Sequence, residues 1–140
     1  MQGSQKFFVC DLCGNLTGLI KNTGVPLVCC GEEMTELVPN TVEASTEKHL
    51  PEVNAETATC SSGCECICVC VQVGSTPHPM ENEHNIMFVF VETENGGQRK
   101  RLKVGDEPKE SFCVANDKPV AVYAYCNLHG LWKTEIKEIK

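Results

Sequence analysis

Cysteine and histidine side chains stand at metal-ligand spacings in two parts of this 140-residue sequence. In the first part, Cys10-x-x-Cys13 is followed further along the chain by the adjacent pair Cys29-Cys30. Four thiolates without a competing histidine suit a tetrahedral zinc ion or a single iron ion. Adjacent ligands must bend the backbone sharply to direct both sulfurs at one ion, so we expect a distorted tetrahedron. A zinc knuckle that only folds a small domain is the alternative for this site.

The second group contains all four histidines, His49, His78, His84 and His129, together with Cys126, three residues before the last of them. Prolines on both sides of His78 fix the backbone where a ligand needs fixing. Neutral imidazoles and one thiolate suit iron, copper or zinc. Five protein ligands leave one octahedral position open, so the sequence predicts a second metal centre that can accept a small molecule.

The elements that position these residues are short and β-rich. The first 38 residues have no helical periodicity and are too few to bury a core. A bound metal is therefore expected to hold this segment in its fold. Residues 39–50 are polar and predict a linker or the entry into a second unit. Beyond them, Asn95-Gly96-Gly97 indicates a hairpin, and a short helix or strand is expected after Trp132. The predicted strands include residues 66–73, 86–91 and 120–125, which favour an all-β sandwich.

Composition excludes several classes of protein. The 11 cysteines are odd in number, and no apolar leader follows Met1, so we expect a reducing compartment, the cytoplasm, and no disulfide scaffold. No apolar run approaches the length of a membrane span. The formal net charge of -7 argues against nucleic acid or an anionic membrane as a partner.

These motifs together resemble the desulfoferrodoxin family, the two-iron class of superoxide reductases. The matching segments follow the family order over nearly the whole chain: Cys10-x-x-Cys13-Gly14, Leu27-Val28-Cys29-Cys30-Gly31-Glu32-x-Met34, Glu47-Lys48-His49-x-Pro51, Val73-Gly74-Ser75-x-Pro77-His78-Pro79-Met80, His84, and Tyr125-Cys126-Asn127-x-His129-Gly130-x-Trp132.

The resemblance implies a mainly β protein of two domains. Residues 1–38 would form a desulforedoxin-like (rubredoxin-like) domain, and residues 39–140 an immunoglobulin-like β-sandwich. The first would hold iron in Cys10, Cys13, Cys29 and Cys30. The second would hold iron by the four histidines as equatorial ligands and by Cys126 as the axial ligand. The family reduces superoxide by one electron to hydrogen peroxide, is re-reduced by rubredoxin or a similar donor, and is usually a homodimer.

Two residues beside His49 acquire catalytic roles from this resemblance. Lys48 would add positive potential at the open position and order a water that delivers a proton to the product. Glu47 resembles the family's carboxylate that occupies the vacant position once the iron is oxidised. Without the surrounding motif, Lys48 would be interpreted as a solvated linker charge.

The cysteines at 60, 64, 66, 68 and 70 depart from the family pattern. Those from 64 to 70 are spaced too far along a strand to surround one ion, so we expect small apolar side chains buried against the other sheet or a dimer partner. The alternatives are a disulfide across the Ser61-Ser62-Gly63 turn or a metal site shared with a second subunit. Cys113 is expected in the core.

The basic cluster of Arg99, Lys100, Arg101 and Lys103 favours a solvated strand face over a docking patch for an acidic partner.

The sequence also leaves two other functions open. One is a non-catalytic electron carrier, in which the four-cysteine iron is the functional centre. The other is a zinc-ribbon interaction module joined to a β-sandwich.

Overall fold

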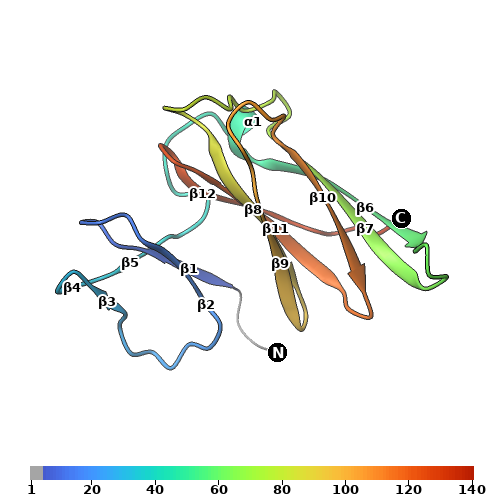
Figure 1. The fold of residues 1–140 in the computed structure, drawn as a ribbon, viewed down its shortest axis with the longest axis horizontal. Coiled ribbons are helices and arrows are strands. Elements are labelled where there is room, and N and C mark those ends of the chain that lie inside the picture. The colour runs from blue at the N-terminus through green and yellow to red at the C-terminus, as the bar shows by residue number, and fades with distance from the viewer. Residues whose placement is uncertain (1–4) are drawn as a thin grey trace. The chain divides into compact units, whose positions relative to one another are not determined.

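A computed structural model describes residues 5–140 of the chain, and residues 1–4, where the predicted first domain begins, lie outside this range. Two compact units are present, residues 1–38 and residues 39–140. Apart from the single helical turn α1 (Thr46–His49), every regular element of the described residues is a strand (Figure 1). The predicted mainly β class is therefore confirmed. None of the helical structure in residues 5–140 is long and apolar enough to cross a membrane.

The small unit consists of five short strands. β1 (Lys6–Val9) pairs antiparallel with β2 (Leu16–Leu19) and with β5 (Thr35–Glu36). β3 (Val28–Cys29) and β4 (Glu32–Glu33) form a separate hairpin.

The small unit has almost no hydrophobic core. Among its described residues, only Phe7 and Cys10 are buried. So small an apolar interior cannot offset the conformational entropy lost on folding. A metal ion held by the cysteines would supply the missing stabilisation, as in other small metal-binding domains.

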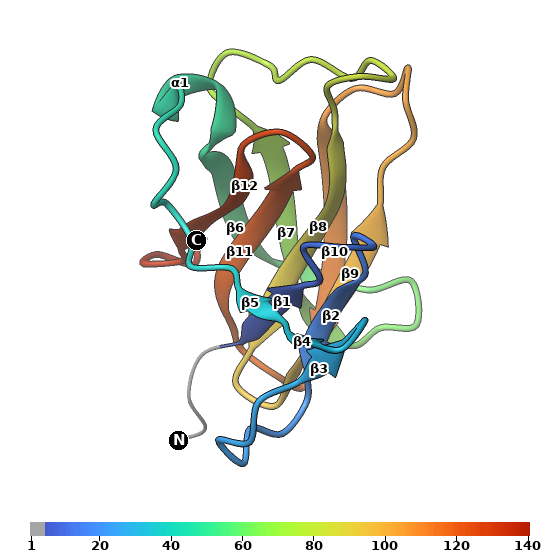
Figure 2. The same ribbon diagram turned by 90° about the vertical axis from the view of Figure 1, so that its left-hand side faces the viewer.

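Two antiparallel sheets face one another in the large unit (Figures 1 and 2). One has the strand order β10-β7-β6, and the other has the order β12-β11-β8-β9. The chain passes between the sheets after β7, β9 and β10, which gives the predicted immunoglobulin-like sandwich. The strands are β6 (Pro51–Thr59), β7 (Glu65–Val73), β8 (Ile86–Thr93), β9 (Gly96–Arg101), β10 (Lys109–Ala115), β11 (Pro119–Cys126) and β12 (Gly130–Glu135).

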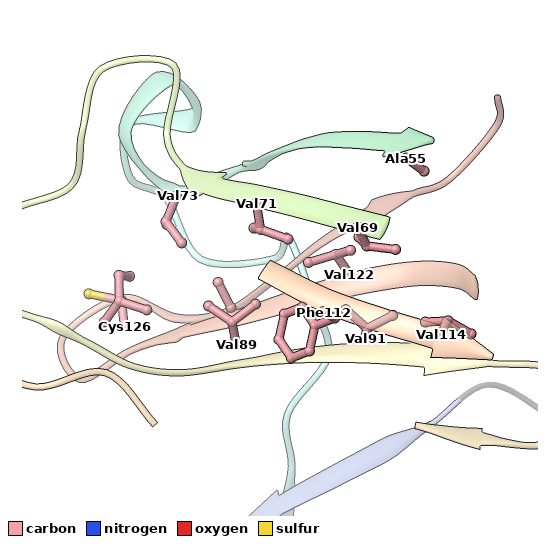
Figure 3. Packing of buried hydrophobic residues seen from close by; sticks show 12 residues of the cluster. Ala55, Val69, Val71, Val73, Val89, Val91, Phe112, Val114, Val122 and Cys126 are labelled. Carbon is pink, nitrogen blue, oxygen red and sulfur yellow. The ribbon is translucent and has the colours of Figure 1, made fainter. Parts of the chain in front are cut away.

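Alternating side chains of these strands form the core. Val69, Val71 and Val73 of β7 point toward the second sheet, because successive residues of a strand face opposite sides. Val89 and Val122 meet them from that second sheet (Figure 3). The remaining buried members are Ala55, Ile86, Val91, Phe112, Val114, Ala124 and Cys126.

Two expectations about the additional cysteines are wrong. The valines of β7 occupy the side that faces the second sheet, so Cys66, Cys68 and Cys70 lie on the outer side and not against that sheet. Cys66 is nevertheless buried, Cys70 is exposed, and burial against a dimer partner stays a prediction. Cys113 is exposed on β10, although it was expected in the core. Its neighbours Phe112 and Val114 take the two inward positions.

The basic cluster lies on and just after β9. Arg99, Lys100, Arg101 and Lys103 are all exposed, as expected of a solvated strand face. Lys100 Nζ lies 3.4 Å from a carboxylate oxygen of Glu110 on the neighbouring sheet and 5.1 Å from the ring centre of Phe112. Exposed pairs of this kind contribute little stability.

The segment expected to be a linker contains α1, which the loop after β7 holds in place. Ser75 Oγ and the Thr76 N–H both donate hydrogen bonds to the Glu47 carbonyl oxygen, at 3.2 and 3.3 Å. The Gly74 N–H donates to Leu50 O at 3.0 Å. Gly74 has a φ of +84°, and a Cβ there would lie 2.5 Å from the carbonyl oxygen of Lys48. The close approach of two backbone segments therefore requires glycine at this position.

We expect Gly74→Ala to destabilise the large unit by at least about 2 kcal/mol, because the methyl group adds a backbone clash to the cost of a left-handed residue. Gly63→Ala is the matched control, since Gly63 has a φ of +87° and nothing within 4 Å of the added Cβ. It should cost about 1 kcal/mol. Urea unfolding followed by the fluorescence of Trp132, the single tryptophan, measures both. Equal losses in the two variants would contradict the clash.

Candidate metal centres

The first cluster gathers the four cysteines of the small unit. The sulfur atoms of Cys10, Cys13, Cys29 and Cys30 all lie within 4.8 Å of one another. The Cys13 and Cys29 sulfurs are 3.7 Å apart, and those of Cys29 and Cys30 are 4.0 Å apart. Cys10 is buried, whereas Cys13 and Cys30 are exposed, so the cluster lies at the surface of its unit.

Backbone geometry explains how adjacent cysteines reach one point. Cys30 has a φ of +55° and Gly31 a φ of +76°, so the chain turns sharply directly after Cys29. A non-glycine residue in this region is strained and persists where the surrounding structure requires it. On the other side, Gly14 ends the Cys-x-x-Cys loop with a φ of +81° and donates its N–H to Cys10 O. Both halves of the cluster therefore depend on left-handed residues.

Two of the four thiols, Cys10 and Cys30, have pKa values shifted in opposite directions. A hydrogen bond from the Cys13 N–H lowers the pKa of Cys10 to about 7. Contacts with the sulfurs of Cys13 and Cys10 raise the pKa of Cys30 to about 12. A sulfur cluster without histidine or carboxylate suits zinc or iron, and the bound cation must displace the remaining thiol protons.

The second cluster lies at one end of the sandwich. His49 ends α1, His78 and His84 lie in the loop between β7 and β8, Cys126 ends β11, and His129 lies in the turn before β12. Strand pairing brings these segments together, because Cys126 pairs with both Ile86 and Gly130. Figure 2 shows α1 and the loop between β7 and β8 at the same end of the unit.

The four imidazole rings form an approximate square. Successive ring centres are 4.7 Å apart for His49 and His78, 4.5 Å for His78 and His84, 5.1 Å for His84 and His129, and 4.8 Å for His129 and His49. The diagonal from His49 to His84 is longer, at 6.3 Å. Neighbouring rings are steeply inclined, at 72° to 84°. Cys126 Sγ lies within 4.8 Å of the nitrogens of His49, His78 and His84, and 3.8 Å from His129 Nδ1.

Hydrogen bonds fix the tautomers of two rings. His49 Nδ1 is 2.7 Å from Ser45 O, and His78 Nδ1 is 2.7 Å from Pro79 O. A carbonyl oxygen only accepts, so each Nδ1 carries the proton and each Nε2 carries a lone pair. The two Nε2 atoms lie 3.2 Å apart, and His129 Nδ1 lies 3.1 Å from the same His49 Nε2. Three ring nitrogens therefore converge, as the ligands of one metal ion would.

His84 supplies a second, independent indication of a metal. Its Nε2 is buried and has no hydrogen-bond partner in the structure. An unpaired buried polar atom costs free energy unless a ligand satisfies it. Burial also lowers the pKa of His49 and His84, and lowers that of His78 to about 4, so these three rings are neutral at physiological pH. Four imidazoles and one sulfur fit a transition-metal ion such as iron.

Two positioning residues could not be assigned a role from the sequence, although both lie in recognised motifs. Trp132 stacks on His49 with ring centres 5.0 Å apart, and its Nε1–H donates to His129 O at 3.1 Å. Asn127 links the loop that carries His84 to the turn that carries His129, because its Oδ1 accepts from the Asn85 N–H and its Nδ2 donates to Glu83 O. Such contacts orient ligands and set the shape of a metal site.

The predicted catalytic pair lies beside the square of rings. Glu47 and Lys48 are exposed on α1, directly before the buried His49. The positive charge of Lys48 contributes to the lowered pKa of both His49 and His84, which occupy opposite corners. After burial, which is the largest cause in both cases, the charge of Lys48 therefore reaches two of the four rings.

Comparisons with known proteins agree with this geometry. The family described as desulfoferrodoxin matches residues 41–135, and the family described as the desulfoferrodoxin N-terminal domain matches residues 3–37. A desulfoferrodoxin from Nitratidesulfovibrio vulgaris is 38% identical over 139 residues, which covers 96% of this chain and 99% of that protein. A desulfoferrodoxin homolog from Archaeoglobus fulgidus is 39% identical over 127 residues, 91% of this chain and 94% of that protein. Among solved structures, the superoxide reductase from Treponema pallidum aligns with a TM-score of 0.71 and 33% identity, covering 94% of this chain and 99% of the other.

The lowered pKa of His78 predicts how the metal-free large unit responds to acid. In the unfolded chain this histidine takes up a proton near its ordinary pKa of 6.5, whereas the folded protein resists protonation until about pH 4. We therefore expect the free energy of unfolding to be level between about pH 7 and about pH 8 and to fall as the pH is lowered from about 6.5 to about 4.

Urea unfolding at a series of pH values, followed by Trp132 fluorescence, measures this dependence. His78→Gln is the control, because it removes one titrating group and leaves the others. The variant should show a shallower decline with falling pH. An identical decline in both proteins would contradict the assignment to His78.

Proposed function

The chain belongs to the desulfoferrodoxin family, and from this premise we propose that it is a superoxide reductase, which adds one electron and two protons to superoxide and releases hydrogen peroxide. The observation that carries the proposal is the square of neutral imidazoles, with lone pairs converging beside Cys126 Sγ. Iron bound at this centre would supply the electron. Five protein ligands leave one octahedral position for the substrate.

Charge supports this choice of substrate. Four neutral imidazoles and one thiolate around a ferrous ion leave about one net positive charge at the site. The surrounding protein is acidic, with a formal net charge of -7, so attraction of a small anion must be local. Lys48 is the residue that supports such attraction, because its charge already influences two of the four rings.

We further propose that Lys48 has two tasks. Its ammonium draws superoxide toward the square of rings, and it orders a water molecule that delivers a proton to the product. The exposed position of Lys48 supports both tasks, since the side chain can exchange protons with solvent. Glu47, also exposed on α1, is the proposed carboxylate that occupies the vacant position in the oxidised state.

The small unit and the partners complete the proposal. Cys10, Cys13, Cys29 and Cys30 would hold the other iron, and electrons would come from rubredoxin or a similar donor in the cytoplasm.

We propose a homodimer, which is supported by exposed apolar side chains on the small unit. These are Leu12, Ile20, Val25, Val28 and Val38.

The alternative functions differ in which metal centre they require. A non-catalytic electron carrier needs only the four-cysteine iron, whereas a zinc-ribbon module needs no iron. Metal analysis of the purified protein distinguishes the zinc-ribbon module from the two iron proteins, because the proposed reductase should contain two irons per chain. The electron carrier requires a kinetic test.

Pulse radiolysis of the reduced protein provides that test. We expect the wild type to consume superoxide with a rate constant of about 10⁹ M⁻¹ s⁻¹. Cys126→Ala should retain the four-cysteine iron and its absorption spectrum but lose at least about 100-fold in rate, because only the second centre loses a ligand. If the variant keeps only the four-cysteine iron and still reacts at the wild-type rate, the second centre is not the site of reaction.

A second kinetic prediction concerns Lys48. We expect Lys48→Ala to slow the capture of superoxide about 10-fold at low ionic strength, to weaken the salt dependence, and to leave both irons bound. Lys118→Ala is the matched control, because it removes the same charge from an exposed lysine beside the opposite end of β11 from Cys126. It should change the rate less than 2-fold. Equal rates in the two variants would show that Lys48 has no special role.

A further inference from the structure

A third cluster of thiols lies outside both proposed iron centres. The sulfur atoms of Cys60, Cys66 and Cys113 all lie within 4.8 Å of one another. They come from three different segments, the turn after β6, the start of β7 and the end of β10. The Cys60 and Cys113 sulfurs are 3.6 Å apart, although 53 positions separate the residues in sequence. Neither iron centre uses any of the three.

The separation of the Cys60 and Cys113 sulfurs matches that of ligands in a metal–thiolate site, and the Cys66 sulfur lies within 4.8 Å of both. A metal–sulfur bond of about 2.3 Å in a tetrahedral site places neighbouring sulfurs about 3.8 Å apart. In the four-cysteine cluster the two shortest separations are 3.7 and 4.0 Å. The 3.6 Å separation of Cys60 and Cys113 is therefore close to the one in the same protein's other thiol cluster.

The backbone holds the three cysteines in this arrangement. Cys66 and Cys113 lie on adjacent strands, in which Cys66 pairs with Ala115 and Cys68 pairs with Cys113. The turn that carries Cys60 is closed by hydrogen bonds from the Cys60 N–H to Cys64 O at 2.7 Å and from the Gly63 N–H to Cys60 O at 2.8 Å. Gln98 Nε2 also donates to Cys113 O at 2.8 Å. A ligand would thus meet a largely preformed site.

We propose that Cys60, Cys66 and Cys113 form a third metal site, which binds a thiophilic cation such as Zn²⁺ or Cu⁺. Three sulfurs from converging segments, with no nitrogen or carboxylate ligand among them, favour a soft ion. Cys66 is buried, Cys60 is half-buried and Cys113 is exposed, so the cation enters from solvent at Cys113 and rests against Cys66. Three thiolates leave the fourth tetrahedral position to water.

The third site is remote from the histidine centre. Cys66 is the second residue of β7 and Val73 is its last, and the loop with His78 and His84 follows Val73. The strand between these two residues is about 23 Å long at the usual rise. One ion cannot bridge the two clusters, so the third site is independent of the proposed reduction of superoxide.

Anaerobic titration of the reduced, iron-loaded full-length protein tests the third site. We expect either Zn²⁺ or Cu⁺, added separately, to bind at one additional equivalent per chain while the iron content stays constant. Cys113→Ser and Cys60→Ser should each weaken this binding at least 10-fold. Both residues lie outside the buried core, so the variants should fold. Elemental analysis after gel filtration, together with competition against a chelator, gives the stoichiometry and the affinity.

Cys70→Ser is the matched control, because Cys70 is an exposed cysteine on the outer side of the same β7 strand but is not one of the three clustered thiols. It should bind the additional metal as the wild type does. The proposal is overturned if the wild type takes up no additional metal, or if Cys113→Ser and Cys60→Ser bind it unchanged. Recovery of a Cys60–Cys113 disulfide without bound metal would also overturn it. Because iron content and superoxide consumption are measured separately, none of these results bears on the reductase proposal.

Discussion

The site of the large unit is constrained by ring nitrogens of several buried histidines, whose lone pairs are directed toward one point. Carbonyl oxygens hold the Nδ1 protons of His49 and His78, which leaves the two Nε2 atoms facing each other at 3.2 Å. His84 Nε2 is buried without a partner. Burial lowers the pKa of all three rings, which disfavours protonation of these nitrogens. A bound cation would accept their lone pairs together, so the arrangement suits a metal site.

The two units meet the need for a metal in opposite ways. In the sandwich, an extensive apolar core packs behind the strands whose ends carry the ligands, so the fold positions the site. In the small unit, Phe7 and Cys10 are the only buried side chains among the described residues, so the site must help to hold the fold. A ligand that is itself left-handed, Cys30, is consistent with this difference, because its strain requires compensation from elsewhere.

The sequence predicted what depends on residue type and local spacing, and it failed where distant segments meet. The sandwich and its hairpin at Asn95 follow from alternation and turn residues. The prediction that the β7 cysteines face the other sheet was wrong, because alternation separates two faces of a strand without showing which one meets the second sheet. The approach of Cys113 to Cys60 depends on the pairing of β7 with β10, which no local pattern reveals. Likewise α1 has only four residues, too few to leave a helical periodicity.

An acidic protein can attract an anionic substrate when the negative charges lie far from the site and positive charges lie close to it. At physiological ionic strength the Debye length is about 8 Å, so exposed carboxylates farther than this from the square of rings are largely screened. Lys48 precedes His49 directly and influences rings at opposite corners of the square, so its charge is felt within that distance. Burial also places His49 and His78 in surroundings of low dielectric constant, where a metal's charge is less weakened than in water. In the proposed reductase, the potential that a small anion meets would therefore be set by the metal and the nearby charges of Lys48 and Glu81, and the net charge of -7 would affect mainly its approach at low salt.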